Sequence, residues 1–296
     1  MHDSGPLVSI VTPSYNQGRF IEDTLLSVMN QAYPEVEHIV VDGGSTDNTV
    51  DILSMYERYY DLKWVSEPDD GQSDAVNKGF RMAKGEIVGW LNSDDVCFDR
   101  SVVSRVVSAF HRLEHAEVLY GDYAVIDEHG SIMQVVTVPD WSYRRLLRSN
   151  YIGQPATYFR RRVVAANPLD RDLHWSMDWE YWLRLGRRYG FAKVDGVLAG
   201  FRVHGDAKSS SNRHLHRAEN VKILEKYGRA FGLSYQAACV LDRLRVGLVE
   251  LKDMKRILQL SDADRLAFKA TIPSRCSRVR SQIPINGALK LLAPGP

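Results

Sequence analysis

Strand and helix patterns alternate through the first ninety residues of the chain, and this alternation restricts the possible folds more than any other feature. Apolar segments typical of buried strands lie at residues 7–12, 37–42, 62–66 and 86–91. Between them, apolar residues recur at helical spacing, over residues 20–29, from about residue 49, and over 73–83. This order of strands and helices predicts an α/β protein in which crossover helices flank a parallel sheet.

The patterns after residue 95 are more mixed. Two strand-like segments, 118–126 and 132–138, flank an Asp127-to-Gly130 turn and predict a hairpin. Further elements are predicted as helices at 141–147, 161–166 and 178–189 and as strands at 156–160 and 196–203.

The chain changes character near residue 212. Residues 213–260 have a helical pattern, so we predict a main domain over 1–211 and a helical extension over 212–296. No acidic residue follows Asp264, which makes the end of the chain basic. Such a tail is either a solvated end or a peripheral contact with anionic lipid headgroups of a membrane.

Composition excludes several classes of protein. A formal net charge of +1 gives no support to nucleic-acid binding by the protein as a whole. The three cysteines lie far apart, so neither a disulfide framework nor a zinc cluster is expected. No window approaches the ~18 apolar residues of a membrane span, and the N-terminus lacks a signal-peptide pattern. We therefore expect a cytoplasmic protein.

The segment Val88–Asp95 joins a buried strand to an amide, a hydroxyl and two carboxylates. Carboxylates are rarely buried without a partner, and open α/β sheets bind ligands at the carboxyl ends of their strands. Hard oxygen ligands favour magnesium or manganese. The segment therefore indicates a divalent cation, although the same residue types also form ordinary turns.

Two more strand ends carry residues suited to a ligand. Tyr15 follows the first strand and could stack on a base or a sugar, or simply cover the end of the sheet. Asp42 ends the second strand, where it could accept a hydrogen bond from a nucleobase or a ribose hydroxyl. Gly43 and Gly44 would let the backbone come close to that ligand. Neither a GxGxxG fingerprint nor a P-loop is present.

Taken together, four segments resemble the family 2 glycosyltransferases. They are Val8–Asn16, Val40–Asp47, Asp74–Gly79 and Leu91–Asp95, and they occur in the family's order and spacing. The resemblance covers roughly residues 7–205. It implies the GT-A fold, a Rossmann-like and mostly parallel sheet with flanking helices. It also implies an inverting transferase that uses a nucleotide-diphosphate sugar and a divalent cation, Mg²⁺ or Mn²⁺.

The resemblance assigns the donor and metal residues. Asp42 corresponds to the nucleobase contact, and Thr12, Pro13 and Tyr15 to the base and ribose pocket. The DxD position is occupied by Asn92-Ser93-Asp94, where Asn92 replaces the usual first Asp but can still bond a hydroxyl. Asp94 would hold the metal, with Asp95 as an alternative or supporting ligand. His204, at the end of the last predicted strand, would complete the metal sphere or meet the diphosphate, and the neighbouring Arg202 would bind phosphate.

Asp178 matches the family's general base, in an acidic motif before an aromatic-rich helix. An inverting transfer needs a base that removes the proton of the attacking hydroxyl. Met177 stands where many members have Glu, which leaves the base itself in place. Glu180 is the fallback base. The alternative is that Asp178 only caps the helix.

The remaining candidates have two interpretations each. Lys78 either approaches the phosphates or pairs with Asp74 four residues earlier on the same helix. Gln154 is a candidate substrate contact. Trp175 and Trp179 either form a platform for a sugar or lipid or belong to the core.

The expected donor is a UDP-sugar, with a dTDP-sugar next, and the acceptor is a hydroxyl of a glycan, a lipid-linked glycan or a small molecule. A sugar-nucleotide pyrophosphorylase is the nearest alternative enzyme, but it needs a glycine-rich basic loop after the first strand, and this chain has Pro13–Arg19 there. A non-catalytic module that binds nucleotide sugars or glycans is the alternative from another class. It fits poorly with the joint presence of Asp42, Asp94, Asp95 and Asp178.

Overall fold

The computed structural model describes residues 5–205 and 213–228, and its centre is a nine-stranded sheet. The first half of the sheet is parallel, in the order β3-β2-β1-β4. These strands are β1 (Val8–Ser14), β2 (Val36–Asp42), β3 (Leu62–Ser66) and β4 (Ile87–Trp90). The crossover helices between them are α1 (Ile21–Met29), α2 (Thr49–Tyr56) and α3 (Gln72–Met82). The predicted α/β alternation is confirmed, although β1 continues through Pro13 to Ser14.

The second half of the sheet begins where β4 pairs with β8 (Thr157–Arg160) in the antiparallel sense. From β8 the order continues to β6 (Val118–Ile126), β9 (Phe191–Arg202) and the short β5 (Val96–Cys97). The predicted hairpin is present, because β7 (Ile132–Val136) pairs antiparallel with β6. The last strand, β9, begins at Phe191 rather than at the predicted residue 196.

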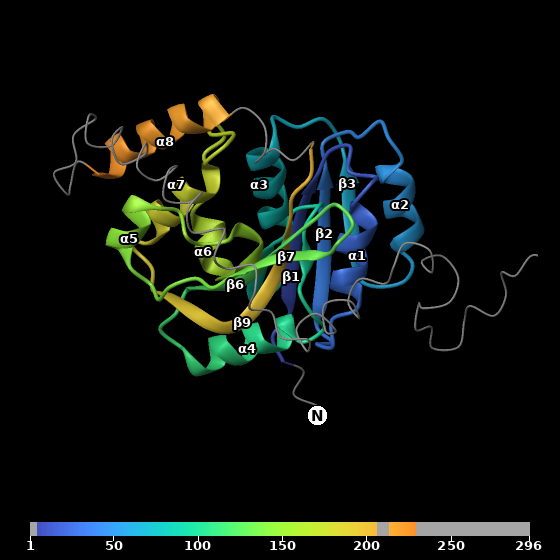
Figure 1. The fold of residues 1–296 in the computed structure, drawn as a ribbon. Helices are drawn as coiled ribbons and strands as arrows, with labels where there is room; N and C mark the ends of the chain where they lie inside the picture. Colours follow the sequence, from blue (N-terminus) through green and yellow to red (C-terminus); the bar gives the residue numbers. More distant parts are fainter. Residues whose placement is uncertain (1–4, 206–212, 229–296) are drawn as a thin grey trace, which may run out of the picture.

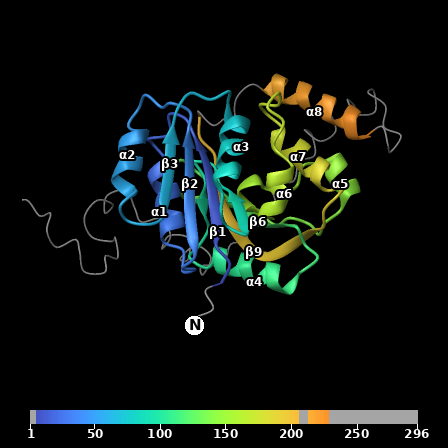
Figure 2. The same cartoon turned by 180° about the vertical axis from the view of Figure 1, so that it is seen from behind.

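Helices cover both faces of the sheet (Figures 1 and 2). Neighbouring strand residues point to opposite faces, so Ile10 packs in one core cluster and Val11 in another. The helices α3, α6 (Arg161–Ala166) and α7 (Met177–Leu185) contribute buried residues to the cluster of Val11. The opposite face is covered by α1, α2 and α4 (Val102–Arg112). Both faces are therefore buried, as a parallel sheet requires.

Two further helices lie beside α7 in Figure 1, α5 (Tyr143–Arg148) and α8 (Arg213–Gly228). The helix α7 ends at Leu185, four residues before the predicted end at residue 189. The predicted continuation of the helical extension to residue 260 and the basic tail after Asp264 lie outside the described residues.

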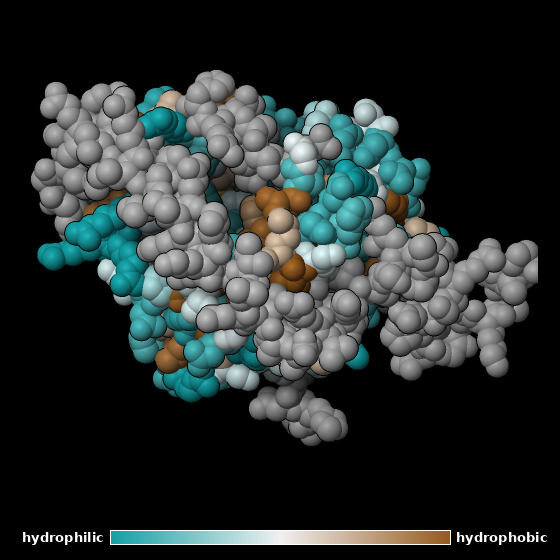
Figure 3. All heavy atoms as spheres, viewed as in Figure 1, coloured by the Kyte–Doolittle hydropathy of each residue, from teal (hydrophilic) through white to brown (hydrophobic). Residues whose placement is uncertain are grey.

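The surface is mostly hydrophilic in the described part of the face drawn in Figure 3, with a small hydrophobic group near its centre. Large hydrophobic side chains are mostly buried, with Tyr15 and Met133 among the exceptions. Within the described residues, no helix has the length and apolar character needed to span a bilayer.

Candidate active site

A cavity of about 710 Å³ lies at the carboxyl ends of the parallel strands, the edge where open α/β sheets bind ligands. One side is formed by the ends of β1 and β4 and by loops that follow β2 and β3. The other side is formed by the segment before α7, by α7 itself and by α8. Asp94 and Asp178, from these two sides, both border the cavity. The two carboxylates are far apart in the sequence, and the fold brings them to the same cavity.

Asn92 stands at the centre of a hydrogen-bonded cluster on the cavity wall. Its Oδ1 accepts from Trp90 Nε1 at 3.0 Å and from Gln72 Nε2 at 2.9 Å. Its Nδ2 donates to Gln154 Oε1 at 2.8 Å, and Gln154 Nε2 donates to the carbonyl of Trp90 at 2.6 Å. The cluster uses Asn92 both as an acceptor and as a donor. A carboxylate cannot donate, so this is a physical reason for Asn at the first DxD position.

Asp94, which borders the cavity, and His204, which is 8% exposed and is not among the cavity residues, form the candidate cation site. His204 Nε2 lies 3.2 Å from Asp94 Oδ2, and the His204 ring packs on Phe20 with centroids 4.4 Å apart. Within residues 5–205 and 213–228, no group of three or more histidine, cysteine or acidic side chains could hold a metal ion. One carboxylate and one imidazole still fit a cation that takes its other ligands from a diphosphate and water, as Mg²⁺ and Mn²⁺ commonly do.

Asp95 faces away from the cavity. It is 1% exposed, its Oδ1 accepts the backbone N–H of Arg202 at 2.8 Å, and it is not among the cavity residues. Burial, followed by the nearby charge of Asp94, raises the pKa of Asp95 well above its usual value. The structure therefore favours Asp94 over Asp95 as the residue that faces a cation.

Side chains of α1 and β9 form hydrogen bonds with the backbone of the 93–95 turn. Thr24 Oγ1 donates to the carbonyls of Ser93 at 2.9 Å and Asp95 at 2.7 Å. Arg202 Nε donates to the carbonyl of Asp94 at 2.7 Å, and its other end pairs with Asp23 at 3.0 Å, with both side chains buried. The guanidinium thus holds the turn that carries Asp94, and nothing in these contacts requires it to bind phosphate.

Asp178 lies in the first turn of α7, where Ser176 is the N-cap residue. Its Oδ2 accepts from Asn150 Nδ2 at 2.9 Å and its Oδ1 from the backbone N–H of Trp179 at 2.7 Å. Burial raises the pKa of Asp178, and these hydrogen bonds oppose the effect. The carboxylate is thus fixed at the cavity wall, and it also accepts one backbone N–H of the first turn of α7.

Glu180, the fallback base, is 1% exposed and is not among the residues that border the cavity. It accepts hydrogen bonds from Tyr227 and from Lys226, the latter at 3.3 Å, and pairs with Arg184 at 3.2 Å. Glu180 therefore joins α7 to α8, and this placement argues against the base role.

Asp42 is fully buried and organises the loop that follows it. Its Oδ2 accepts from the backbone N–H of Ser45 at 2.8 Å and from Ser66 Oγ at 2.7 Å. Asp42 is not among the residues that border the cavity, whereas Gly43 and Asp69 are. A Cβ on Gly43 would lie only 2.7 Å from Asp69 Oδ2, so a larger residue there would require the Asp69 side chain to move.

Asp69 is a candidate that the sequence analysis missed. Its Oδ1 accepts the backbone N–H of Gly71 at 2.8 Å, and burial raises the pKa of its carboxyl. It lies in the loop after β3, whereas Asp42 is the last residue of β2 and pairs in register with Ser66 of β3. Acidic residues directly after the third predicted strand were the signal for it.

Of the other residues predicted to bind the nucleotide sugar, some line the cavity and one lies in the protein interior. Pro13 and Tyr15 line the cavity, as does Ser93, and Tyr15 is 60% exposed. Thr12 is fully buried, and its Oγ1 lies 2.9 Å from His38 Nε2. Thr12 therefore contacts the neighbouring strand β2 inside the protein and does not border the cavity.

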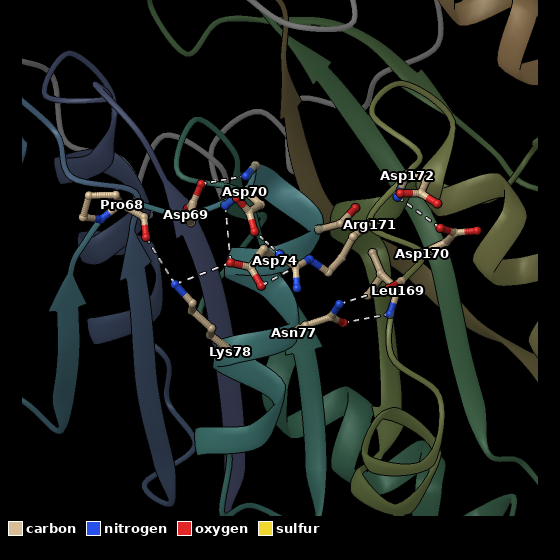
Figure 4. Close-up of polar contacts among 12 residues, drawn as sticks. Pro68, Asp69, Asp70, Asp74, Asn77, Lys78, Leu169, Asp170, Arg171 and Asp172 are labelled. Carbon is tan, nitrogen blue, oxygen red and sulfur yellow. Dashed lines mark hydrogen bonds and ion pairs between the residues drawn. The ribbon is translucent and has the colours of Figure 1, made fainter.

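Asp74 and Lys78 lie outside the cavity, in an ion-pair network between α3 and the 169–172 segment (Figure 4). Lys78 Nζ pairs with Glu67 at 2.9 Å and with Asp74 at 3.5 Å. Asp74 also lies 3.6 Å from Arg171. Lys78 therefore pairs with two carboxylates, and its Nζ lies closer to Glu67 than to Asp74.

Gln154 and Trp175 also border the cavity, with Asn150, His174 and His216 beside them. Trp179 is buried, and its Nε1 donates to the carbonyl of Leu146 at 2.8 Å. Trp179 is therefore a core residue, whereas Trp175 is available to a ligand in the cavity.

Comparison with known families gives a match over more than half of the chain. Residues 9–166 match the family described as "Glycosyl transferase family 2". The matched region contains the donor side of the cavity and ends before Asp178.

Similar proteins carry the same description. An uncharacterized glycosyltransferase of Nostoc sp. is 27% identical over 271 residues, which are 85% of this chain and 80% of that protein. The putative teichuronic acid biosynthesis glycosyltransferase TuaG of Bacillus subtilis is 47% identical over 92 residues, 30% of this chain. For TuaG, and for an uncharacterized glycosyltransferase of Rickettsia felis that is 27% identical over 71% of this chain, the match spans 36% of the relative's length.

Solved structures share the fold at low sequence identity. Residues 1–349 of Staphylococcus aureus TarS in complex with UDP-GlcNAc superpose with a TM-score of 0.57 at 20% identity, over 78% of this chain and 74% of that chain. The mannosyltransferase PcManGT from Pyrobaculum calidifontis, in complex with GDP-Man and Mn²⁺, gives a TM-score of 0.57 at 18% identity, over 91% and 86% of the two chains. The predicted GT-A fold is confirmed.

Proposed function

Because the chain belongs to glycosyltransferase family 2, we propose that it transfers a sugar, with inversion, from a nucleotide-diphosphate donor to a hydroxyl acceptor. The observation that carries the proposal is the single cavity bordered by Asp94 on one side and Asp178 on the other. A UDP-sugar is the first donor to test and a dTDP-sugar the second. Complexes of similar folds with UDP-GlcNAc and GDP-Man support a nucleotide-sugar donor as a class.

The donor would occupy the side formed by the parallel strands. Tyr15 is exposed at the cavity and can stack on the base or ribose. Asp69 can accept a hydrogen bond from a base N–H, a role for which Asp42 is less suited because its carboxylate is buried in its own loop. Asp94 and His204 would hold the divalent cation, which when bound supplies positive charge to the leaving diphosphate.

Asp178 would act as the general base. The acceptor hydroxyl attacks the anomeric carbon from the face opposite the diphosphate, the bond to the diphosphate breaks, and the hydroxyl proton passes to a carboxylate oxygen of Asp178. Asn150 orients that carboxylate by its 2.9 Å hydrogen bond. A positioned general base contributes about 10²–10⁴-fold in rate.

Replacement of the base tests this mechanism. Asp178→Asn keeps the shape and the contact with Asn150 through an amide oxygen but cannot take a proton, so kcat should fall by about 10²–10⁴-fold. Asp172→Asn is the matched control, because Asp172 is exposed on the loop before α7 and does not border the cavity. Folded Asp178→Asn protein that retains the wild-type transfer rate would reject the role of Asp178.

A donor screen tests the substrate class. Thermal stability measured with UDP-, dTDP- and GDP-sugars, each with and without Mn²⁺, should rise for one nucleotide class and rise further with the metal. Transfer should stop in excess EDTA and return when Mn²⁺ or Mg²⁺ is added. Undiminished transfer in EDTA would contradict the cation, and donor binding without product formation under all conditions would favour a non-catalytic module.

A further inference from the structure

The helix α8 is attached to the segment just before α7 by the part-buried carboxylate of Glu219. Glu219 accepts three backbone N–H groups, from His174, Trp175 and Ser176, each at 2.8 Å. Hydrogen bonds to an ionised carboxylate are about twice as strong as neutral ones. Glu219 therefore fixes α8 against the segment that forms the acceptor side of the cavity.

Contacts along the rest of α8 set its position further. Asn220 Oδ1 accepts from Ser176 Oγ at 2.7 Å, and two turns later Tyr227 and Lys226 reach Glu180 of α7. Asn220 and Tyr227 are buried in these contacts. The helix α8 is therefore held at its middle by the segment before α7 and at its C-terminal end by Glu180 of α7, and it lies beside α7 (Figure 1).

His216 lies three and four residues before Glu219 and Asn220, so all three share one face of α8. This face carries the imidazole to the cavity wall, where Asp178 also lies. His216 remains exposed to solvent, and its Nδ1 lies 3.5 Å from Asn220 Nδ2. The cavity is therefore bordered by a base-type carboxylate and an ionisable imidazole from two different helices.

We infer that α8 belongs to the catalytic site and that His216 is a positioning residue, which acts on Asp178 from the acceptor side of the cavity. This inference rests on the proposed function, because it assumes that Asp178 is the base. A positive charge on His216 at the wall of the same cavity favours the ionised form of the carboxylate, which is the form that accepts the hydroxyl proton. The electrostatics agree in sign, since the charge of His216 lowers the pKa of Asp178 against the effect of burial.

Other charged groups lie around His216 and Asp178, and they form the electrostatic surroundings in which the pKa of Asp178 is measured. Those on the cavity wall are Asp69, Asp94, His174 and Arg202, and those on the helices packed around Asp178 are Arg145, Arg148, Glu180 and Glu219. Glu180 and Glu219 are occupied by contacts between α7 and α8. Of the ionisable groups in this set, His216 shares the wall of the cavity with Asp178, and its charge lowers the pKa of Asp178.

The test compares His216→Gln, which removes the charge, with His216→Lys, which keeps one, and with Lys222→Gln as a control on an exposed residue of α8 away from the cavity. In His216→Gln the acidic limb of the pH–kcat profile should move to higher pH while the donor KM stays at the wild-type value. His216→Lys should move the limb back, and Lys222→Gln should leave it unchanged. An unchanged limb in His216→Gln would overturn the inference.

A second measurement separates this inference from the proposed function. The pKa of Asp178 can be followed by carboxyl-carbon NMR without substrate, and it should rise in His216→Gln and not in Lys222→Gln. This result does not require transfer activity, so it decides the coupling even if no donor is accepted. Equal Asp178 titrations in wild type and His216→Gln would refute it.

Discussion

The substitution Asn92→Asp restores the usual first residue of the DxD position, and we expect it to destabilise this protein. Asn92 Nδ2 donates to Gln154 Oε1 at 2.8 Å, and Gln154 Nε2 donates to the Trp90 carbonyl at 2.6 Å. The introduced carboxylate would place an oxygen against Gln154 Oε1. Rotation of the Gln154 amide would only move the conflict, because Oε1 would then face the Trp90 carbonyl.

The size of the destabilisation by Asn92→Asp follows from the hydrogen-bond donors and acceptors around residue 92. In either orientation of Gln154, one hydrogen bond is lost and one acceptor faces another acceptor. Gln154 is 9% exposed, so water cannot readily replace the lost donor. An acceptor left without a donor in such a place costs about 1–3 kcal/mol. We take about 2 kcal/mol, which at roughly 2–4 °C per kcal/mol for domains of this order of size lowers Tm by about 4–8 °C.

Thermal unfolding of four variants in a double-mutant cycle measures this effect. Gln154→Leu removes the opposing oxygen, so Asn92→Asp should cost less in that background than in wild type. The cost in the wild-type background should also shrink as the pH is lowered, because a protonated carboxyl can donate to Gln154 Oε1. An equal loss of Tm in both backgrounds, or no loss in either, would refute the reasoning.

Three further perturbations test other parts of the site. Arg202→Lys keeps the charge but loses the forked contacts with Asp23 and the Asp94 carbonyl. The free energy of unfolding, measured in urea, should therefore fall by about 3 kcal/mol. A fall of less than about 1 kcal/mol would contradict the importance of this buried ion pair. Lys78→Ala should change stability by at most about 1 kcal/mol and leave the calorimetric affinity for UDP unchanged, whereas a large loss of affinity would return Lys78 to the phosphates. Because burial raises the pKa of Asp178 above its ordinary 3.8 and the base must be ionised, kcat should fall as the pH drops through that raised pKa, and the midpoint in a pH–rate profile should lie above 3.8.

Sequence patterns predicted the parallel half of the fold well because its signals are local. Strands β1, β2 and β4 are buried almost throughout, and the edge strand β3 matches its predicted bounds at Leu62 and Ser66 although only Leu62 is buried. The helix α4 was missed although Val102, Val103, Val106, Val107 and Phe110 form a clear helical stripe. The first part of β9 was not predictable, because its pairing with β6 shifts register near Gly121 and interrupts the alternation.

The site was harder to predict than the fold, since a sequence does not show which carboxylates face a cavity. Asp74 and Glu180 resemble site residues in pattern, yet their partners Arg171 and Tyr227 lie far along the chain. Such partners appear only after folding. His216 was missed for the same reason, as its place depends on how α8 docks on α7.

The sheet changes from parallel to antiparallel pairing between β4 and β8, and this change indicates where chimeras of these enzymes can be joined. Most residues suited to the nucleotide precede this junction in the sequence, and most residues suited to the acceptor follow it. Chimeras with a relative joined between the two strands should therefore exchange acceptor preference while keeping donor preference. Asn92 and Gln154 bond across the junction, so both must come from one parent or be matched by design.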